Sequence, residues 1–221
     1  MRPDTSPGTG DSIVRRIGIL GGAFDPPHLA HQALAQSAVA QLGLDTLHIV
    51  PTGQAIHRTG LLTAAQHRLS MAHLAFANIT PVAVDDREIT RCGPSYTIDT
   101  LHEITTLWPM CEIFLIMGAD QARALHRWRA YPEIIRLATI GIADRNYSAG
   151  TGGDRAALQQ NQPQRPDEQA AIRQVHLRMP VLPISATDIR AKIAAGQDVN
   201  TLITSPVARY IARHHLYTKI Q

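Results

Sequence analysis

The sequence predicts an α/β fold, in which a doubly wound parallel sheet carries helices on both faces and a small helical part follows at the C-terminal end. Two observations favour this fold class. Short apolar runs that are typical of buried strands alternate with longer segments of helical periodicity. The first run, residues 17–20, also ends in a glycine pair that leads into a helix, and such folds bind ligands at the carboxyl ends of their strands.

The other elements follow in order along the chain. Further strands are expected at 46–50, 81–84, 112–117, 138–143 and within 175–183. Helices are expected at 28–42, 63–76, 95–108, in short pieces over 121–137, at 185–195 and at 205–217. Because the strands are expected to be parallel, their carboxyl ends share one edge of the sheet, and the crossovers between them are expected to be right-handed.

Small polar residues and glycines mark the helix ends. Side chains with a short polar group accept hydrogen bonds from first-turn N–H groups, and glycine adopts the left-handed conformation that ends a helix. The predicted N-caps are Asp25 (before Pro26), Ser95, Ser185 and Ser205; Thr63 with Gln66 is a predicted capping box; and the predicted C-caps are Gly43 and Gly196.

Length and composition predict one domain over 15–221, with a disordered leader at 1–14 and a polar surface excursion at about 146–168. The net charge of +3 includes no Lys/Arg block, so nucleic acid binding is not expected. No apolar run reaches about 18 residues, so no membrane span is expected. Cys92 and Cys111 fit neither a metal spacing nor a disulfide framework, which favours the cytoplasm. The sequence does not specify an oligomeric state.

The glycine pair Gly21 and Gly22, with the helix after it, predicts an anion site. Glycine lets the backbone approach a ligand closely, and the N–H groups and dipole of a helix start favour negative charge. His28 and His31 are three residues apart at this start, so both imidazoles are expected on one face as additional donors. The alternative is a pair of surface histidines.

A second helix start, I-S-A-T-D-I-R at 184–190, has a similar composition. The hydroxyls of Ser185 and Thr187 and the N–H groups beside them can bind phosphate. Arg190, one turn later, offers a planar fork that matches phosphate oxygens. Taken alone, the segment is more typical of an ordinary capped helix with a solvated arginine, and the histidine motif shifts the balance towards a phosphate site.

Both stretches resemble signatures of the nucleotidyltransferase superfamily, its [HT]-x-G-H and I-S-S-T-x-I-R motifs. The chain departs at Ala30 and Ala186, where glycine and serine are usual. The resemblance implies a Rossmann-like fold and catalytic roles for His31, His28 and Arg190. It also implies an ATP site formed by Gly21, Gly22, Ala23, Phe24, His28, His31, Gly118, Asp120, Ser185, Thr187 and Arg190.

Three further stretches resemble one family in that superfamily, the bacterial nicotinate-nucleotide adenylyltransferases. They are G-P-S-Y-T-I-D-T-L at 93–101, G-A-D at 118–120 followed by Trp128, and a loop at 51–58 that ends in Arg58 in place of lysine. The resemblance implies an acceptor site formed by Arg58, Ser95, Tyr96, Thr97 and Trp128.

Physical chemistry supports these acceptor roles. The N–H groups of a helix that starts at Ser95 lie at a positive dipole end, which suits a nicotinate carboxylate. Trp128 can stack on the cationic pyridine ring, and its neighbours Arg127 and Arg129 indicate partial exposure. A core position for Trp128, and a helix N-cap in place of a ribose contact for Asp120, are the alternatives.

The implied reaction transfers the adenylyl group of ATP to nicotinate mononucleotide, giving deamido-NAD and pyrophosphate in NAD biosynthesis. ATP and nicotinate mononucleotide are the expected partners. Mg²⁺ is expected to arrive with ATP, held mainly by phosphates and water, with no protein metal site. The alternatives are transfer to another small phosphate ester, such as phosphopantetheine, and a nucleotide-sensing domain without turnover.

Overall fold

The central feature of the protein is a six-stranded parallel sheet with the strand order β3-β2-β1-β4-β5-β6. The computed structural model describes residues 14–54, 62–144 and 172–218. The predicted doubly wound sheet is confirmed. The strands are β1 (Arg15–Gly22), β2 (Thr46–Pro51), β3 (Val82–Val84), β4 (Cys111–Gly118), β5 (Ala138–Asp144) and β6 (Gln174–Arg178).

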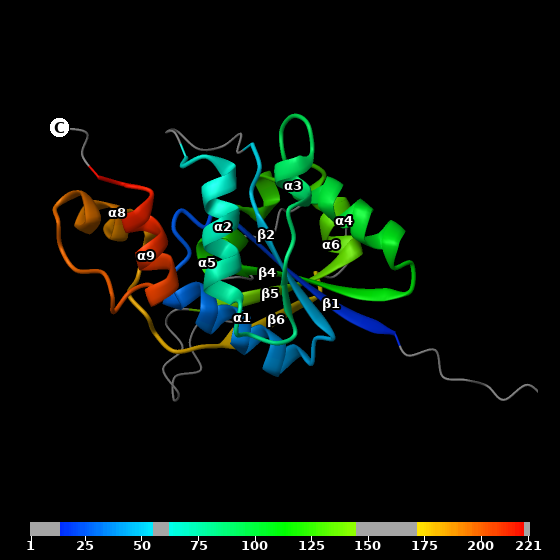
Figure 1. The fold of residues 1–221 in the computed structure, drawn as a ribbon. Coiled ribbons are helices and arrows are strands. Elements are labelled where there is room, and N and C mark those ends of the chain that lie inside the picture. The colour runs from blue at the N-terminus through cyan, green and yellow to red at the C-terminus, as the bar shows by residue number, and fades with distance from the viewer. Residues whose placement is uncertain (1–13, 55–61, 145–171, 219–221) are drawn as a thin grey trace, which may run out of the picture.

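Helices cover both faces of the sheet, as Figure 1 shows. One face packs against α1 (Leu29–Leu42), α2 (Ala65–Phe76), α8 (Ala186–Ala194) and α9 (Ser205–Arg213). The other packs against α4 (Thr97–Leu107), α5 (Ala119–Ala124), the 3₁₀ turn η1 (Leu125–Arg127) and α6 (Tyr131–Leu137). The short helix α3 (Arg87–Thr90) follows β3. The expected C-terminal helical part consists of α8 and α9.

Side chains of the central strands alternate between two apolar cores. In β1, Ile17 and Ile19 pack on the α4 side, whereas Leu20 packs on the α1 side. In β4, Leu115 packs on the α4 side and its neighbour Ile116 on the α1 side. Because both faces are buried, these strands appear in the sequence as continuous apolar runs, which is why they could be located without periodicity.

The helix starts differ from prediction at four of the five expected positions. The N-caps are His28 rather than Asp25, Ala64 rather than Thr63, Tyr96 rather than Ser95, and Thr204 rather than Ser205. Ser185 does cap α8, since its Oγ accepts from the N–H of Asp188 at 3.1 Å. Gly43 ends α1 in the left-handed conformation, as expected.

Two of these differences have clear physical causes. A residue before proline is disfavoured in the helical conformation, and Asp25 and Pro26 both precede a proline, so α1 begins only after Pro27. The backbone N–H of Thr63 donates to the buried carboxylate of Asp25 at 3.2 Å, and the carbonyl of Thr63 accepts from Arg68 Nε at 2.8 Å. The predicted capping box of Thr63 and Gln66 does not form.

The strand order places a switch point between β1 and β4. From β1 the chain adds β2 and β3 on one side, then returns to add β4, β5 and β6 on the other. Loops that leave β1 and β4 at their carboxyl ends therefore diverge, and a crevice forms between them. The predicted ligand residues after Gly22 and Gly118 lie at this crevice.

Some predictions fall outside the described residues. These are the leader, apart from Val14, the excursion at about 146–168, and Arg58. Among the described residues, no helix combines the length and the apolar character that crossing a membrane requires.

Candidate active site

A cavity of about 390 Å³ opens at the switch point, on the α4 side of the sheet. Its floor is apolar and comes from strand residues such as Ile19, Val50 and Leu115. Four stretches that lie far apart in the sequence form its walls. Most of the predicted residues of those stretches line it: Gly21, Gly22, Ala23, Ser95, Tyr96, Thr97, Asp120 and Trp128.

The glycine turn after β1 forms one wall. A Cβ on Gly21 would meet no atom within 4 Å, whereas a Cβ on Gly22 would lie 3.1 Å from the ring of Phe24. Phe24 has a φ of 48° and is 2% exposed. Its ring packs edge-on against His31, with centroids 5.0 Å apart, so the turn directly supports the histidine pair.

The two histidines lie together at the start of α1, as predicted. Their rings are stacked with centroids 3.7 Å apart. The N–H of His28 donates to His31 Nδ1 at 3.2 Å. An Nδ1 that accepts carries no proton, so in the neutral ring of His31 the donor is Nε2–H. Neither histidine lines the cavity, so the pair forms a separate part of the site beside it.

Arg190 joins α8 to the β1–α1 turn. Its Nη1 donates to the carbonyl of Asp25 at 2.7 Å, and its Nη2 to Thr187 Oγ1 at 3.3 Å. Ser185 donates to Asp188 Oδ2 at 2.7 Å in addition to capping the helix. Arg190, Thr187 and the histidines therefore border the same turn, from the side of the sheet that carries α1 and α8.

Asp25, from the same turn, is 3% exposed and connects distant parts of the chain. The hydroxyl of Tyr217 donates to its Oδ1 at 2.6 Å, and the N–H of Thr63 to its Oδ2. Burial and this carboxylate raise the pKa of the Tyr217 hydroxyl. Asp25 thus ties the C-terminal segment and the entry to α2 to the turn, in place of the capping role that was predicted.

The opposite wall of the cavity contains Trp128 and Asp120. Trp128 is half-buried and lines the cavity, in agreement with the partial exposure predicted for it. Asp120 is exposed in the first turn of α5 and pairs with Arg123. It is not an N-cap, since Gly118 holds that position. The guanidinium carbon of Arg129 lies 4.4 Å from the ring centroid of Tyr96, a contact that was not predicted.

The start of α4 forms the third wall. Tyr96 is its N-cap, and no side chain caps the helix. Ser95 instead donates its hydroxyl to the carbonyl of Glu88 at 3.3 Å. The N–H of Asp99 donates to the carbonyl of Tyr96 at 3.1 Å. The N–H groups of the first two residues, Thr97 and Ile98, have no acceptor one turn earlier within the helix, and Thr97 lines the cavity. An uncapped positive helix end therefore opens into the cavity.

Sequence analysis missed Arg68, which is 2% exposed. Its guanidinium donates to the carbonyls of Ala23 and Gly53 at 3.0 and 3.3 Å, in addition to Thr63. It therefore fixes the turn after β1 against the segment after β2. A signal was available, because Arg68 precedes the apolar residues Met71, Ala72 and Ala75 at helical spacing on the buried face of α2.

Glu88 and Thr100 were also missed, and both line the cavity. Thr100, which is 1% exposed, donates to Glu88 Oε1 at 3.0 Å. Burial raises the pKa of the Glu88 carboxyl, and the hydrogen bond from Thr100 opposes that shift. Glu88 is thus a buried carboxyl that is bound to α4 through Thr100 beside the cavity.

Fold and site together define a nucleotidyltransferase. Residues 19–192, most of the chain, match the model of the cytidylyltransferase-like family. A glycine turn with paired histidines at one side of a switch-point crevice, and a second helix start with an arginine beside it, agree with that class.

Individual relatives show which nucleotidyltransferase family the chain belongs to. A protein of Albidiferax ferrireducens named "Probable nicotinate-nucleotide adenylyltransferase" is 51% identical over 206 residues, which cover 92% of this chain and 98% of that protein. One of the same name from Methylibium petroleiphilum is 39% identical over 209 residues, covering 92% of each. The chain belongs to the nicotinate-nucleotide adenylyltransferase family, as the motifs implied.

The fold is also that of a solved relative. The structure described as Plasmodium falciparum nicotinic acid mononucleotide adenylyltransferase complexed with NaAD superposes with a TM-score of 0.72. It covers 92% of this chain and 97% of the other at 19% identity. The Rossmann-like architecture predicted from the resemblance is thereby confirmed.

Proposed function

We propose that the enzyme binds nicotinate mononucleotide in the cavity and ATP across the β1–α1 turn, so that the two substrates meet at the glycine pair. Transfer of the adenylyl group of ATP to nicotinate mononucleotide, in NAD biosynthesis, is the activity of its family. The assignment of the two substrates to these two parts of the site is our proposal. It rests on the uncapped start of α4, which opens into a cavity with an apolar floor.

The acceptor end is assigned to α4 and Trp128. The N–H groups at the start of α4 would bind the nicotinate carboxylate, because both their direction and the helix dipole favour a negative charge. Trp128, which is half-buried across the cavity, would stack on the cationic pyridine ring. A neutral amide would gain less at the same helix end. Arg58 is proposed to contact the mononucleotide phosphate.

The ATP end is assigned to the residues around the β1–α1 turn. His31, through Nε2–H, would donate to the α-phosphate as charge develops on it, and His28 and Arg190 would hold the triphosphate. Asp120 would accept from ribose hydroxyls. The remaining contacts would come from the turn and from two helix starts, at Gly21, Gly22, Ala23, Phe24, Gly118, Ser185 and Thr187.

The chemical step needs little from the protein beyond positioning and charge. A phosphate oxygen of nicotinate mononucleotide attacks the α-phosphorus of ATP, the bond from that phosphorus to the bridging oxygen breaks, and pyrophosphate leaves with the electron pair. The nucleophile is already an anion near neutral pH, so no general base is required. Catalysis then rests on alignment and on stabilisation of the transition-state charge.

Enzymes of this class use a divalent metal with ATP, and we propose Mg²⁺. Among the residues described, no group of three or more His, Cys, Asp and Glu side chains is arranged to hold an ion. A metal that arrives with ATP would be held mainly by phosphates and water. We also propose a cytoplasmic enzyme without nucleic acid or membrane partners, and the unpaired thiols of Cys92 and Cys111 support that compartment.

A pyrophosphate-release assay with a panel of acceptors tests the proposal. We expect kcat/KM for nicotinate mononucleotide to exceed that for nicotinamide mononucleotide by about tenfold or more, the scale for a site built around one polar group. Phosphopantetheine should give no turnover. Equal kcat/KM for the two mononucleotides would show that the start of α4 does not recognise the nicotinate carboxylate. ATP binding without any pyrophosphate release would indicate a nucleotide sensor.

A further inference from the structure

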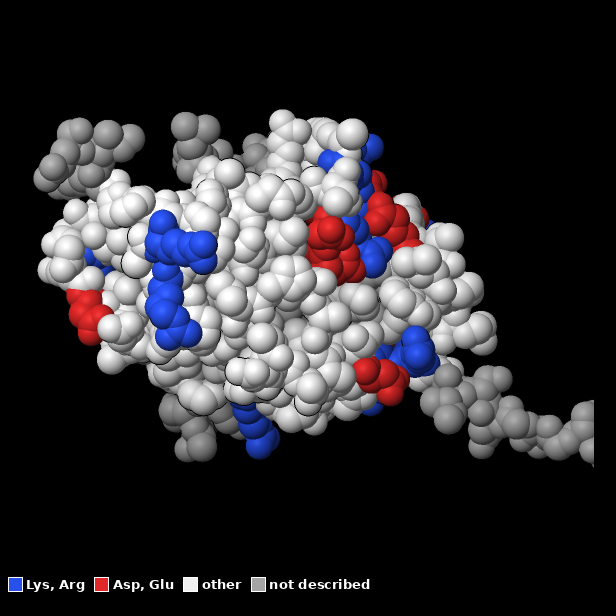
Figure 2. Space-filling model, in the orientation of Figure 1, with Lys and Arg blue, Asp and Glu red and all other residues white. Residues whose placement is uncertain are grey.

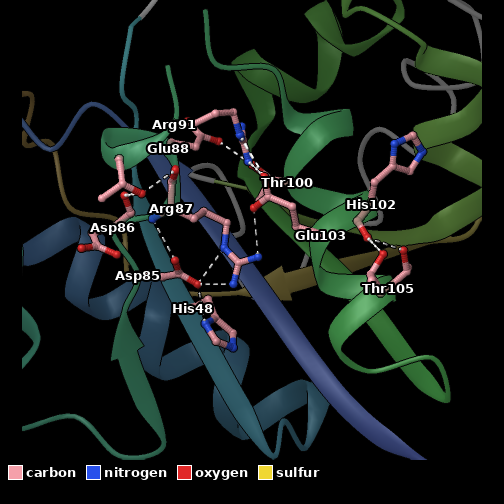
Figure 3. A network of polar contacts seen from close by, with 12 residues as sticks. His48, Asp85, Asp86, Arg87, Glu88, Arg91, Thr100, His102, Glu103 and Thr105 are labelled. Carbon is pink, nitrogen blue, oxygen red and sulfur yellow. Dashed lines mark hydrogen bonds and ion pairs between the residues drawn. The ribbon is translucent and has the colours of Figure 1, made fainter. Parts of the chain in front are cut away.

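A network of charged side chains on α3 and α4 borders the acceptor wall without belonging to the sequence motifs of the ATP site. Figure 2 shows charges of both signs gathered on the surface where Figure 1 places these two helices. Figure 3 shows the network from close by, extending from His48 on β2 to Glu88 and Thr100. It therefore connects the sheet to the cavity through Arg87 and Arg91, which both bind Glu103.

The outer part of the network is centred on Arg87. Its Nε and Nη2 donate to Asp85 Oδ2 at 2.9 and 2.6 Å, and His48 Nδ1 lies 3.0 Å from the same oxygen. Burial opposes ionisation of Asp85, but the contacts with His48 and Arg87 outweigh it and hold the pKa of that carboxyl well below its usual range. Arg87 reaches α4 only at Glu103, at 3.5 Å.

The inner part is centred on Arg91. Its Nη2 and Nε donate to Glu103 Oε1 at 2.6 and 3.0 Å. The same Nη2 lies 3.3 Å from Thr100 Oγ1, which in turn donates to the cavity residue Glu88. One planar guanidinium thus contacts α4 at two successive turns, and a planar fork is well suited to fix direction as well as distance.

These contacts fall close to the open helix start. Thr100 and Glu103 come three and six residues after Thr97, so Arg91 holds the first two turns of α4. The segment before the helix is held as well, since Ser95 donates its hydroxyl to the carbonyl of Glu88 and its N–H to the carbonyl of Gln54. At Gly53, a Cβ would lie 1.9 Å from that Glu88 carbonyl, so only glycine allows this approach.

We propose that Arg91 is a positioning residue for acceptor choice: by holding Thr100 and Glu103 it sets the direction in which the first N–H groups of α4 point into the cavity, and so the discrimination between a nicotinate and a nicotinamide group. The inference rests on the proposed acceptor site at Thr97. A role limited to stability would instead change melting temperature and leave discrimination unaltered.

Arg87 provides a matched control for this inference. It has the same side chain, precedes Arg91 by one helical turn, and is similarly buried, with 13% of its side chain exposed against 17% for Arg91. Among the residues described, it makes no hydrogen bond to Thr100. Substitution of either arginine removes a charge and an ion pair with Glu103, and substitution of Arg87 also removes the pair with Asp85. Only substitution of Arg91 removes the bond to Thr100 beside the cavity.

The experiment compares Arg91→Met, Arg91→Lys and Arg87→Met in the full chain. For each, kcat/KM is measured with nicotinate and with nicotinamide mononucleotide, together with KM for ATP and the melting temperature. We expect Arg91→Met to lower the acid-to-amide ratio by about tenfold, the scale of a small misplacement of binding groups, with KM for ATP unchanged. Arg91→Lys should retain part of the ratio, and Arg87→Met should retain all of it.

Two results would overturn the inference: an unchanged ratio in Arg91→Met, or an equal fall in Arg91→Met and Arg87→Met. If Arg91→Met does not fold, Arg91→Lys decides, because lysine keeps the charge and lacks the planar fork that contacts Thr100 and Glu103 together. A lower ratio in Arg91→Lys than in Arg87→Met supports the inference, and equal ratios in the two variants reject it. A wild-type enzyme without acid preference would instead reject the proposed acceptor site.

Discussion

The two helix starts at the ends of the site, those of α4 and α8, have similar sequences and different structures. Both were predicted to be capped by a serine. Ser185 does cap α8, through its bond from the N–H of Asp188, whereas Ser95 turns away to the carbonyl of Glu88 and leaves α4 uncapped. The cap takes one N–H group of α8, that of Asp188, whereas no side chain caps α4, whose first residue, Thr97, lines the cavity.

The starts of α4 and α8 also differ in their surroundings. The start of α4 opens into the cavity, and Arg91 holds the first two turns of the helix. At the start of α8, Ser185 and Asp188 bind each other. This helix contributes to the site mainly through Arg190, which donates to the carbonyl of Asp25 in the β1–α1 turn. We therefore expect α4 to determine which acceptor binds, and the turn with its histidines and α8 to determine turnover and ATP binding.

The largest effect is expected at the ATP end. Replacement of His31 by alanine should lower kcat by about a hundredfold or more, the scale of losing one transition-state donor, while KM for nicotinate mononucleotide changes little. Steady-state kinetics measure both. His31→Gln, which keeps an N–H donor, should recover part of the loss. A kcat within a few-fold of wild type would show that the donor lies elsewhere.

A smaller effect, confined to the acceptor end, is expected for Trp128→Ala. Loss of stacking on a cationic ring should raise KM for nicotinate mononucleotide about tenfold and leave KM for ATP near its wild-type value. Trp108, which packs beside His48 away from the cavity, provides the control. If Trp128→Ala raised both constants together, the tryptophan would be structural and the two ends would not be separable.

The smallest effect is expected for Ser185→Ala. Loss of an N-cap costs about 1 kcal/mol of the free energy of unfolding, which corresponds to roughly 2–4 °C in melting temperature for a domain of this size. KM for ATP should rise modestly, and the acid-to-amide ratio should stay at its wild-type value. A change in that ratio would mean that α8 takes part in acceptor choice, contrary to the comparison.

Local patterns in the sequence were sufficient for the fold, whereas most of the site residues were assigned from the resemblance to the family and remain predictions. Buried parallel strands such as β1 and β4 are continuous apolar runs, and the glycine turn and the histidines are short-range motifs. Because the strands are parallel, residues near Gly22 and Gly118 were expected at one edge of the sheet. Ala23, Thr97 and Trp128, which the resemblance implied, line one cavity there.

Long-range side-chain contacts were not predictable in the same way. Arg68 contacts Ala23 across 45 positions, and Arg91 contacts Glu103 across 12. Local composition does not specify such pairs. The error at Ser95 has the same origin, because its hydroxyl is taken by Glu88, seven residues earlier. The consecutive prolines after Asp25, by contrast, were visible in the sequence, and their effect on the helix start was underestimated.

The most direct test of the open helix start is the variant Thr97→Pro. Thr97 is the first residue of α4, where proline is tolerated, and Tyr96 before it has the extended conformation that a residue before proline prefers, with φ −118° and ψ 140°. The substitution thus removes one N–H group and retains the helix. Thr97→Ala controls for loss of the side chain.

The measurement is the ratio of kcat/KM for nicotinate mononucleotide to that for nicotinamide mononucleotide, in Thr97→Pro and in Thr97→Ala. If the N–H groups of α4 bind the carboxylate, the ratio falls about tenfold or more in Thr97→Pro and stays near the wild-type value in Thr97→Ala, with KM for ATP unchanged in both. A wild-type ratio in a folded Thr97→Pro enzyme would contradict the account, because the carboxylate would then be recognised without the start of α4.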